Sequence, residues 1–178
     1  MMGKADGLKA MDLSADGFWD SFFAIVVALP ALIVGWVSYA NQISGPAGQF
    51  IDRLSLVLRL ATAEVGAWVL PLVVLAAVAP RAGIADRFVH YVVASNWASA
   101  LLVWLMLPPV LLKLFLPSAG ELVSFVSLMF FFGSMVLTWR MTNVVYAKGP
   151  AIGTAVFAGM FASALAVLFA LQYLLGLY

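Results

Sequence analysis

Residues 151–177 read AIGTAVFAGMFASALAVLFALQYLLGL, a run of 27 residues without a single Asp, Glu, Lys or Arg. The hydrocarbon core of a bilayer is about 30 Å thick, and roughly 20 apolar residues of α-helix cross it. Gly149-Pro150 stands directly before the run and is a favourable helix start. The stretch therefore predicts a transmembrane helix, and four other long apolar runs precede it in the chain.

Together the five runs predict an all-α fold, a polytopic transmembrane helical bundle. A short N-terminal segment, residues 1–17, precedes one membrane domain, residues 18–178. The expected spans are 18–40, 56–79, 88–115, 122–139 and 151–177. Pro108-Pro109 is expected to bend or unwind the third span near its outer end. A transmembrane barrel would instead show alternating segments of about ten residues.

Composition excludes several classes of protein. Apolar residues make up 65% of the chain and charged residues 10%, and the mean hydropathy is +1.09, whereas a soluble domain has about 25% charged residues. Nine basic and eight acidic residues give a net charge of +1, which is too little for a nucleic-acid-binding surface. The chain has no cysteine, so thiol chemistry, disulfides and Cys-ligated metals are absent.

Basic residues near the span ends predict the orientation of the bundle. With five spans, the N-terminus and the second and fourth links lie on one side and carry six Lys or Arg, against three on the other. We therefore expect a cytoplasmic N-terminus and an external C-terminus, in a bacterial inner membrane. The N-terminus lacks the pattern of a secretory signal peptide, so the first span is expected to stay on the mature protein.

Glu64 is the strongest candidate for a functional polar residue. A charged side chain at mid-membrane costs at least about 2.5–3.5 kcal/mol, so each one marks a candidate site. We place Glu64 about two turns into the second span, near the outer face. It is interpreted either as an interfacial residue that is solvated or paired, or as a ligand of an ion or proton.

The third span is the most polar, and its candidates are His90, Asn96 and Ser99. One histidine cannot build a zinc or haem site alone, so His90 is interpreted as interfacial. Asn96 and Ser99 are expected to hydrogen-bond between helices, with a substrate pathway as the alternative. Arg140, after the fourth span, is interpreted as a cytoplasmic anchor, or as part of a docking surface for a partner or an anionic headgroup.

Small residues recur on the fifth span at the spacing that lets helices approach closely in lipid. One row contains Ala155, Gly159 and Ser163, and a second contains alanines 158, 162, 166 and 170. The rows predict packing against another span of the same chain or against another protein.

No motif of a known catalytic class occurs, including His-Glu-x-x-His, the phosphate-binding loop and Gly-x-Ser-x-Gly. We therefore expect no enzymatic activity, no metal and no cofactor. The first hypothesis is an integral membrane accessory or scaffold protein that packs in the lipid bilayer against a partner membrane protein or a homo-oligomer. The alternative is a small oligomeric transporter or channel that uses Glu64 and the polar third span.

The chain also resembles bacterial members of the Yip-domain superfamily. The resemblance rests on Glu64-Val65-Gly66-Ala67-Trp68, the polar link to Arg87-Phe88, the Pro108-Pro109 pair and Trp139-Arg140 before a Gly-Pro helix start. It covers residues 54–176 and implies five spans with a cytoplasmic N-terminus. Eukaryotic relatives organise membranes and bind small GTPases, bacterial relatives have no settled role, and the resemblance implies no catalytic residue. The short N-terminal segment of this chain departs from GTPase-binding relatives.

Overall fold

The computed structural model describes residues 7, 10–45, 49–115 and 120–177. Within these ranges the chain is helical and contains no β-strand, and five helical segments are long and apolar enough to cross a membrane. The predicted all-α transmembrane class is therefore confirmed. Of the predicted N-terminal segment, residues 1–17, positions 1–6 and 8–9 lie outside the described residues.

The helices follow one another along the chain with short links. They are α2 (Ala15–Asp20), α3 (Phe23–Ser44), α4 (Phe50–Val78), the 3-10 turn η1 (Ala85–Arg87), α5 (Phe88–Phe115), α6 (Gly120–Tyr146) and α7 (Pro150–Leu174).

The first span is interrupted near its start. The Ser14 side chain caps α2 by accepting a hydrogen bond from the Gly17 backbone N–H. Asp12 accepts a bond from the Ser14 backbone N–H, which lowers the pKa of the Asp12 carboxyl from its ordinary value. Across the start of α3 the backbone N–H groups of Phe22, Ala24 and Ile25 bond at the tighter i→i−3 spacing. The first span is thus α2 and α3 together, Ala15–Ser44.

Four spans differ in their bounds from the prediction, and α5 has the predicted bounds. The first span, predicted as 18–40, extends from Ala15 to Ser44. Helix α4 begins six residues early, at Phe50, and carries charged residues in its first turns. Helix α6 continues beyond Arg140 to Tyr146, and polar side chains there bond back to carbonyls of the preceding turn, as Asn143 does to Trp139. Helix α5 stays helical through Pro108-Pro109, so unwinding at that pair was a wrong expectation.

Helix α7 ends three residues early, at Leu174, because Gly176 adopts the left-handed backbone conformation with φ 63°. The Leu177 N–H then bonds back to the Gln172 carbonyl at 2.9 Å, a six-to-one closure typical of helix C-termini.

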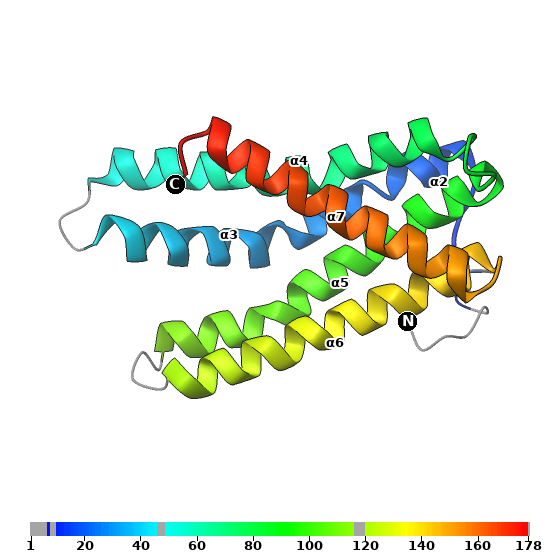
Figure 1. Cartoon of the computed structure of the whole chain (residues 1–178). Helices are drawn as coiled ribbons and strands as arrows, with labels where there is room; N and C mark the ends of the chain where they lie inside the picture. Colours follow the sequence, from blue (N-terminus) through cyan, green and yellow to red (C-terminus); the bar gives the residue numbers. More distant parts are fainter. Residues whose placement is uncertain (1–6, 8–9, 46–48, 116–119, 178) are drawn as a thin grey trace.

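The helices converge at one end of the molecule and separate at the other (Figure 1). At the closed end lie α2, the link before α5 and the link before α7. The main hydrophobic core is found there and joins α4, α5 and α6, with members such as Leu75, Val92 and Val145. Toward the other end, the α3–α4 pair and the α5–α6 pair diverge, and α7 crosses the outside of α4. We call the end where the helices diverge the open half of the molecule.

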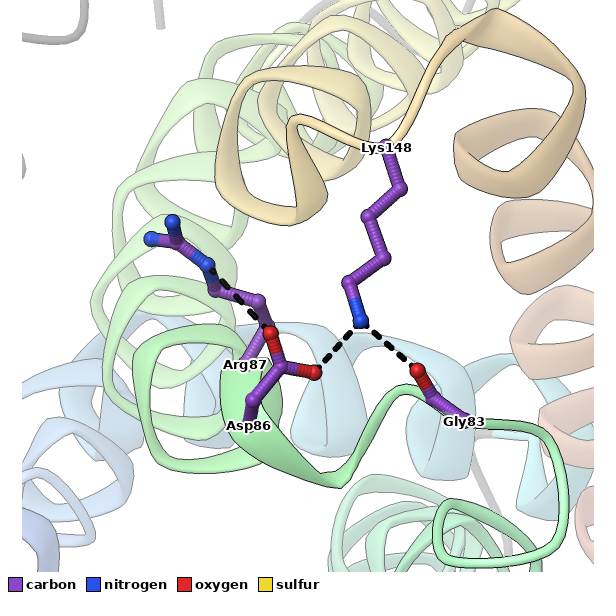
Figure 2. A network of polar contacts seen from close by, with 4 residues as sticks. All are labelled: Gly83, Asp86, Arg87 and Lys148. Atoms are coloured by element: carbon purple, nitrogen blue, oxygen red, sulfur yellow. Dashed lines mark hydrogen bonds and ion pairs between the residues drawn. The ribbon is translucent and has the colours of Figure 1, made fainter.

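Polar contacts join the two links at the closed end (Figure 2). Lys148, before α7, lies 2.6 Å from Asp86 Oδ1 and also donates to the Gly83 carbonyl at 2.6 Å. Arg87 lies farther from the same carboxylate, with Nε 3.9 Å from Oδ2. These contacts hold the links that precede α5 and α7 on one side, as the five-span order requires.

Candidate functional site

The open half of the molecule contains a cavity of about 620 Å³ between α3, α4, α5 and the end of α7. Volumes of this size are typical of small-molecule sites. Most of the lining is apolar. The polar or aromatic groups on the wall are Trp36, Tyr39, Glu64, Ser99 and Gln172.

Glu64 is tied to the wall of this cavity by the indole of Trp36. Trp36 Nε1 donates to Glu64 Oε2 at 2.8 Å. Trp36 is buried, with 5% of its surface exposed, whereas Glu64 remains accessible from the cavity. The bond therefore fixes one carboxylate oxygen and leaves the other free to meet a bound group.

No basic side chain neutralises Glu64 among the residues that the structure describes. Arg59 stands one turn away on the same helix, but its Nη1 donates to the carbonyl of Leu175 at 3.2 Å. That contact places a cation at the C-terminus of α7, where the helix dipole favours it. The Glu64 carboxylate consequently has a hydrogen-bond donor but no ion-pair partner within the described chain.

The depth of Glu64 follows from the length of α4. Because the helix begins at Phe50, Glu64 lies at its midpoint instead of two turns from its start. Arg81, the first basic residue after α4, is 17 residues further along, or about 25 Å of helix. A hydrocarbon core is about 30 Å thick, so Glu64 falls within it when Arg81 lies at the opposite surface.

Asn96 faces a different part of the interior and is fully buried. Its Oδ1 accepts from Trp68 Nε1 at 2.9 Å, and its Nδ2 donates to Ser21 Oγ at 2.9 Å. Ser21 Oγ in turn donates to the Phe18 carbonyl at 2.7 Å. The chain of bonds connects α4, α5 and the turn between α2 and α3. Asn96 therefore hydrogen-bonds between helices, as one of the two interpretations expected.

Ser99, one turn after Asn96, lines the cavity with Glu64. It also lines a second cavity, of about 260 Å³, between α4, α5, α6 and α7. The structure thus brings Glu64 and Ser99 to one cavity and leaves Asn96 out of it.

His90 and Arg140 lie away from the cavity. His90 is half-buried in the first turn of α5, and its Nδ1 atom is buried without a hydrogen-bond partner in the described chain. Arg140 is exposed on α6, six residues before that helix ends. It therefore does not follow the fourth span, as the sequence suggested, but forms part of it.

The predicted small-residue row on α7 lies beside α4, and the close contact of α7 with α6 is made elsewhere. It is at Gly153, where an added Cβ would collide with Asn143 of α6. Ala155, Gly159 and Ser163 instead line an open groove of about 390 Å³ beside α4. An added Cβ at Gly159 would meet open space. The second row, alanines 158, 162, 166 and 170, is exposed along its length.

Two parts of this arrangement were not predicted from the sequence. Trp36 and Gln172 join the cavity from helices far from Glu64 in the chain, and no local motif marks them. The Lys148–Asp86 contact likewise joins residues 62 positions apart. Within the described residues, no cluster of three His, Cys, Asp or Glu side chains is placed to hold a metal ion.

No family model matches the sequence, and comparisons with curated proteins and with solved structures gave no match. The resemblance to the Yip-domain superfamily therefore stays an expectation from the motifs, and function is argued from the geometry.

Proposed function

We propose that the protein is a non-enzymatic accessory or scaffold protein of the bacterial inner membrane, and that it associates with a second copy of itself through α7. The observation that carries the proposal is the exposed surface of α7. In the most apolar 18-residue window of this helix, no residue is buried within the described chain. One side of α7 packs on α4 and α6, and its remaining apolar surface must contact lipid or another helix.

The exposed face of α7 has the shape that two identical helices need for packing. A ridge of larger side chains, Phe161, Leu165 and Phe169, is 36%, 37% and 54% exposed. Beside it, the alanines 158, 162, 166 and 170 form an exposed row of small side chains, which we call the furrow. Ridges pack into grooves between helices, and in a two-fold dimer the same face meets itself. The ridge of one copy therefore fits the furrow of the other.

The orientation that we propose has the closed end in the cytoplasm. The basic residues of the second and fourth links support it, because positive charge favours the cytoplasmic side. The N-terminus is then cytoplasmic and the C-terminus external. The accessory role is the one that the resemblance to membrane-organising proteins would also favour.

Cysteine cross-linking in the native membrane tests self-association. Because the chain has no cysteine of its own, one introduced cysteine is the single thiol through which two copies can be linked. Ala162→Cys places a thiol in the furrow, and mild oxidation should give a disulfide-linked dimer. The matched control is Val136→Cys on α6, which is 52% exposed but lies on another helix. Equal cross-linking of both variants would mean random collision and would contradict the proposal.

The cavity at Glu64 supports a second candidate function, a small oligomeric transporter or channel. An unpaired carboxylate and the Ser99 hydroxyl on one wall provide polar groups at hydrocarbon depth. Reconstitution in liposomes tests this candidate. Flux that is present in the wild type and absent in Glu64→Gln is expected of a transporter, and equal flux in both would contradict it.

A further inference from the structure

We propose that the cavity at Glu64 is a binding site for a hydrophobic organic monocation. Such a ligand carries one ammonium or other onium group on an apolar skeleton with one or more rings. The inference names the ligand class for the cavity of the second candidate function, and it requires binding but no transport.

Charge is the first reason. A carboxylate within a membrane domain favours a partner of opposite charge, since it is costly to leave it uncompensated in a low-dielectric environment. Glu64 is the single charged side chain among the described residues that line the cavity. Arg59, the nearest cation on the same helix, bonds to the end of α7 instead. A ligand with one positive charge would complete the pair.

The walls of the cavity are the second reason. Trp36, which bonds to the carboxylate, and Tyr39 contribute aromatic rings to the wall of the cavity, and aromatic faces attract organic cations. The remaining lining is largely aliphatic, including Leu102, Met106 and Val110. An apolar ligand body would bury its surface against these side chains. The cavity is open to its surroundings and not enclosed, so a ligand dissolved in the membrane can reach it.

The number of oxygen atoms argues against a small inorganic cation. Calcium takes six to eight oxygen ligands, and magnesium six. On the described wall, side-chain oxygens come only from Glu64, Ser99, Tyr39 and Gln172, which belong to four different helices. A single carboxylate among carbon atoms suits a cation whose charge is spread over an organic group.

The test is equilibrium binding of tetraphenylphosphonium to the full-length protein in lipid nanodiscs, with empty nanodiscs subtracted. The wild type should bind the cation saturably. Glu64→Gln keeps the size of the side chain and an acceptor for Trp36, and should weaken binding at least about tenfold, or about 1.4 kcal/mol. Glu121→Gln removes an exposed acid at the start of α6 and should change nothing.

A steric variant tests the cavity without changing charge. Gly35 lines the cavity, and an added Cβ there meets no atom within 4 Å. Gly35→Leu should therefore fill the space, leave folding intact and abolish binding. Gly133→Leu, at an open position on α6, is the matched control and should bind as the wild type does.

Three results would overturn the inference. They are unchanged binding by Glu64→Gln, equal loss in Glu64→Gln and Glu121→Gln, and equal affinity for neutral triphenylphosphine oxide. Saturable binding without uptake into liposomes would support this inference and remove the transporter candidate. These binding measurements do not test self-association through α7, because Glu64 and Gly35 lie on other helices.

Discussion

Trp36 on α3 donates an indole hydrogen bond to the carboxylate of Glu64 on α4, with 2.8 Å between Nε1 and Oε2. The bond joins two helices in the half of the molecule where the hydrophobic core is sparse. It also sets the position of the one charged group on the described wall of the cavity. Trp36 is thus a positioning residue for Glu64 as well as a helix contact.

Removing this donor should weaken the bundle measurably. Interhelical hydrogen bonds in membranes contribute about 0.6 kcal/mol on average and up to about 1.7 kcal/mol. We expect Trp36→Phe to lower the free energy of unfolding by an amount in this range, as measured by denaturant titration in mixed micelles. Trp97→Phe is the control, because Trp97 is 38% exposed and makes no hydrogen bond through its indole in the described chain. Equal losses in the two variants would assign the effect to ring size alone.

Removing the Asn96 side chain should lower the melting temperature more than removing that of its neighbour Ser95. Asn96→Ala removes both interhelical bonds. Ser21 keeps its bond to the Phe18 carbonyl, but the partly buried Trp68 indole loses its acceptor, and an orphaned buried polar group costs about 1–3 kcal/mol. Ser95 bonds only to the Val92 carbonyl of its own helix, so Ser95→Ala should change the melting temperature little. Similar melting temperatures for both variants would show that the network adds no stability.

The crossing of α6 and α7 depends on the absence of a side chain at Gly153. A Cβ there would collide with the side chain and backbone of Asn143. Overpacking of this kind costs about 1–3 kcal/mol, so Gly153→Ala should be destabilised by that amount in the same denaturant titration. Gly133→Ala adds a methyl group to open space on α6 and should be neutral or more stable by up to about 1 kcal/mol. Greater stability of Gly153→Ala would contradict the described crossing.

The orientation can be checked with single cysteines in the links. Gln49, before α4, and Ala82, before α5, are both exposed and lie at opposite ends of the second span. A membrane-impermeant thiol reagent should label Gln49→Cys in intact spheroplasts and Ala82→Cys only after permeabilisation. The reverse pattern would place the N-terminus outside, and labelling of both from one side would contradict the span count.

Local sequence features predicted the helices well and their tertiary contacts poorly. Apolar runs gave the number of spans and the bounds of α5, because hydropathy and length decide whether a helix crosses a bilayer. The end of α6 was missed because polar residues such as Asn143 end the apolar run but still belong to the helix. Hydropathy shows where apolar residues stop, and the backbone hydrogen bonds of the helix can continue beyond that point.

The sequence predicted individual residues of the candidate site but not their arrangement. Glu64 was singled out because charge is rare in a span, and Ser99 because it lies on the most polar helix. Their shared cavity depends on how α3, α4 and α5 diverge, which no residue spacing encodes. Trp36 is 28 positions from Glu64 and resembles any interfacial tryptophan until the fold brings the two together.

Native mass spectrometry of the protein, extracted gently from its own membrane, tests self-association most directly. We expect a dimer of the 19.1 kDa chain, and we expect Ala162→Leu, which fills the furrow of α7, to convert it to a monomer. A wild-type protein found only as a monomer, or bound to another protein without a second copy of itself, would contradict it.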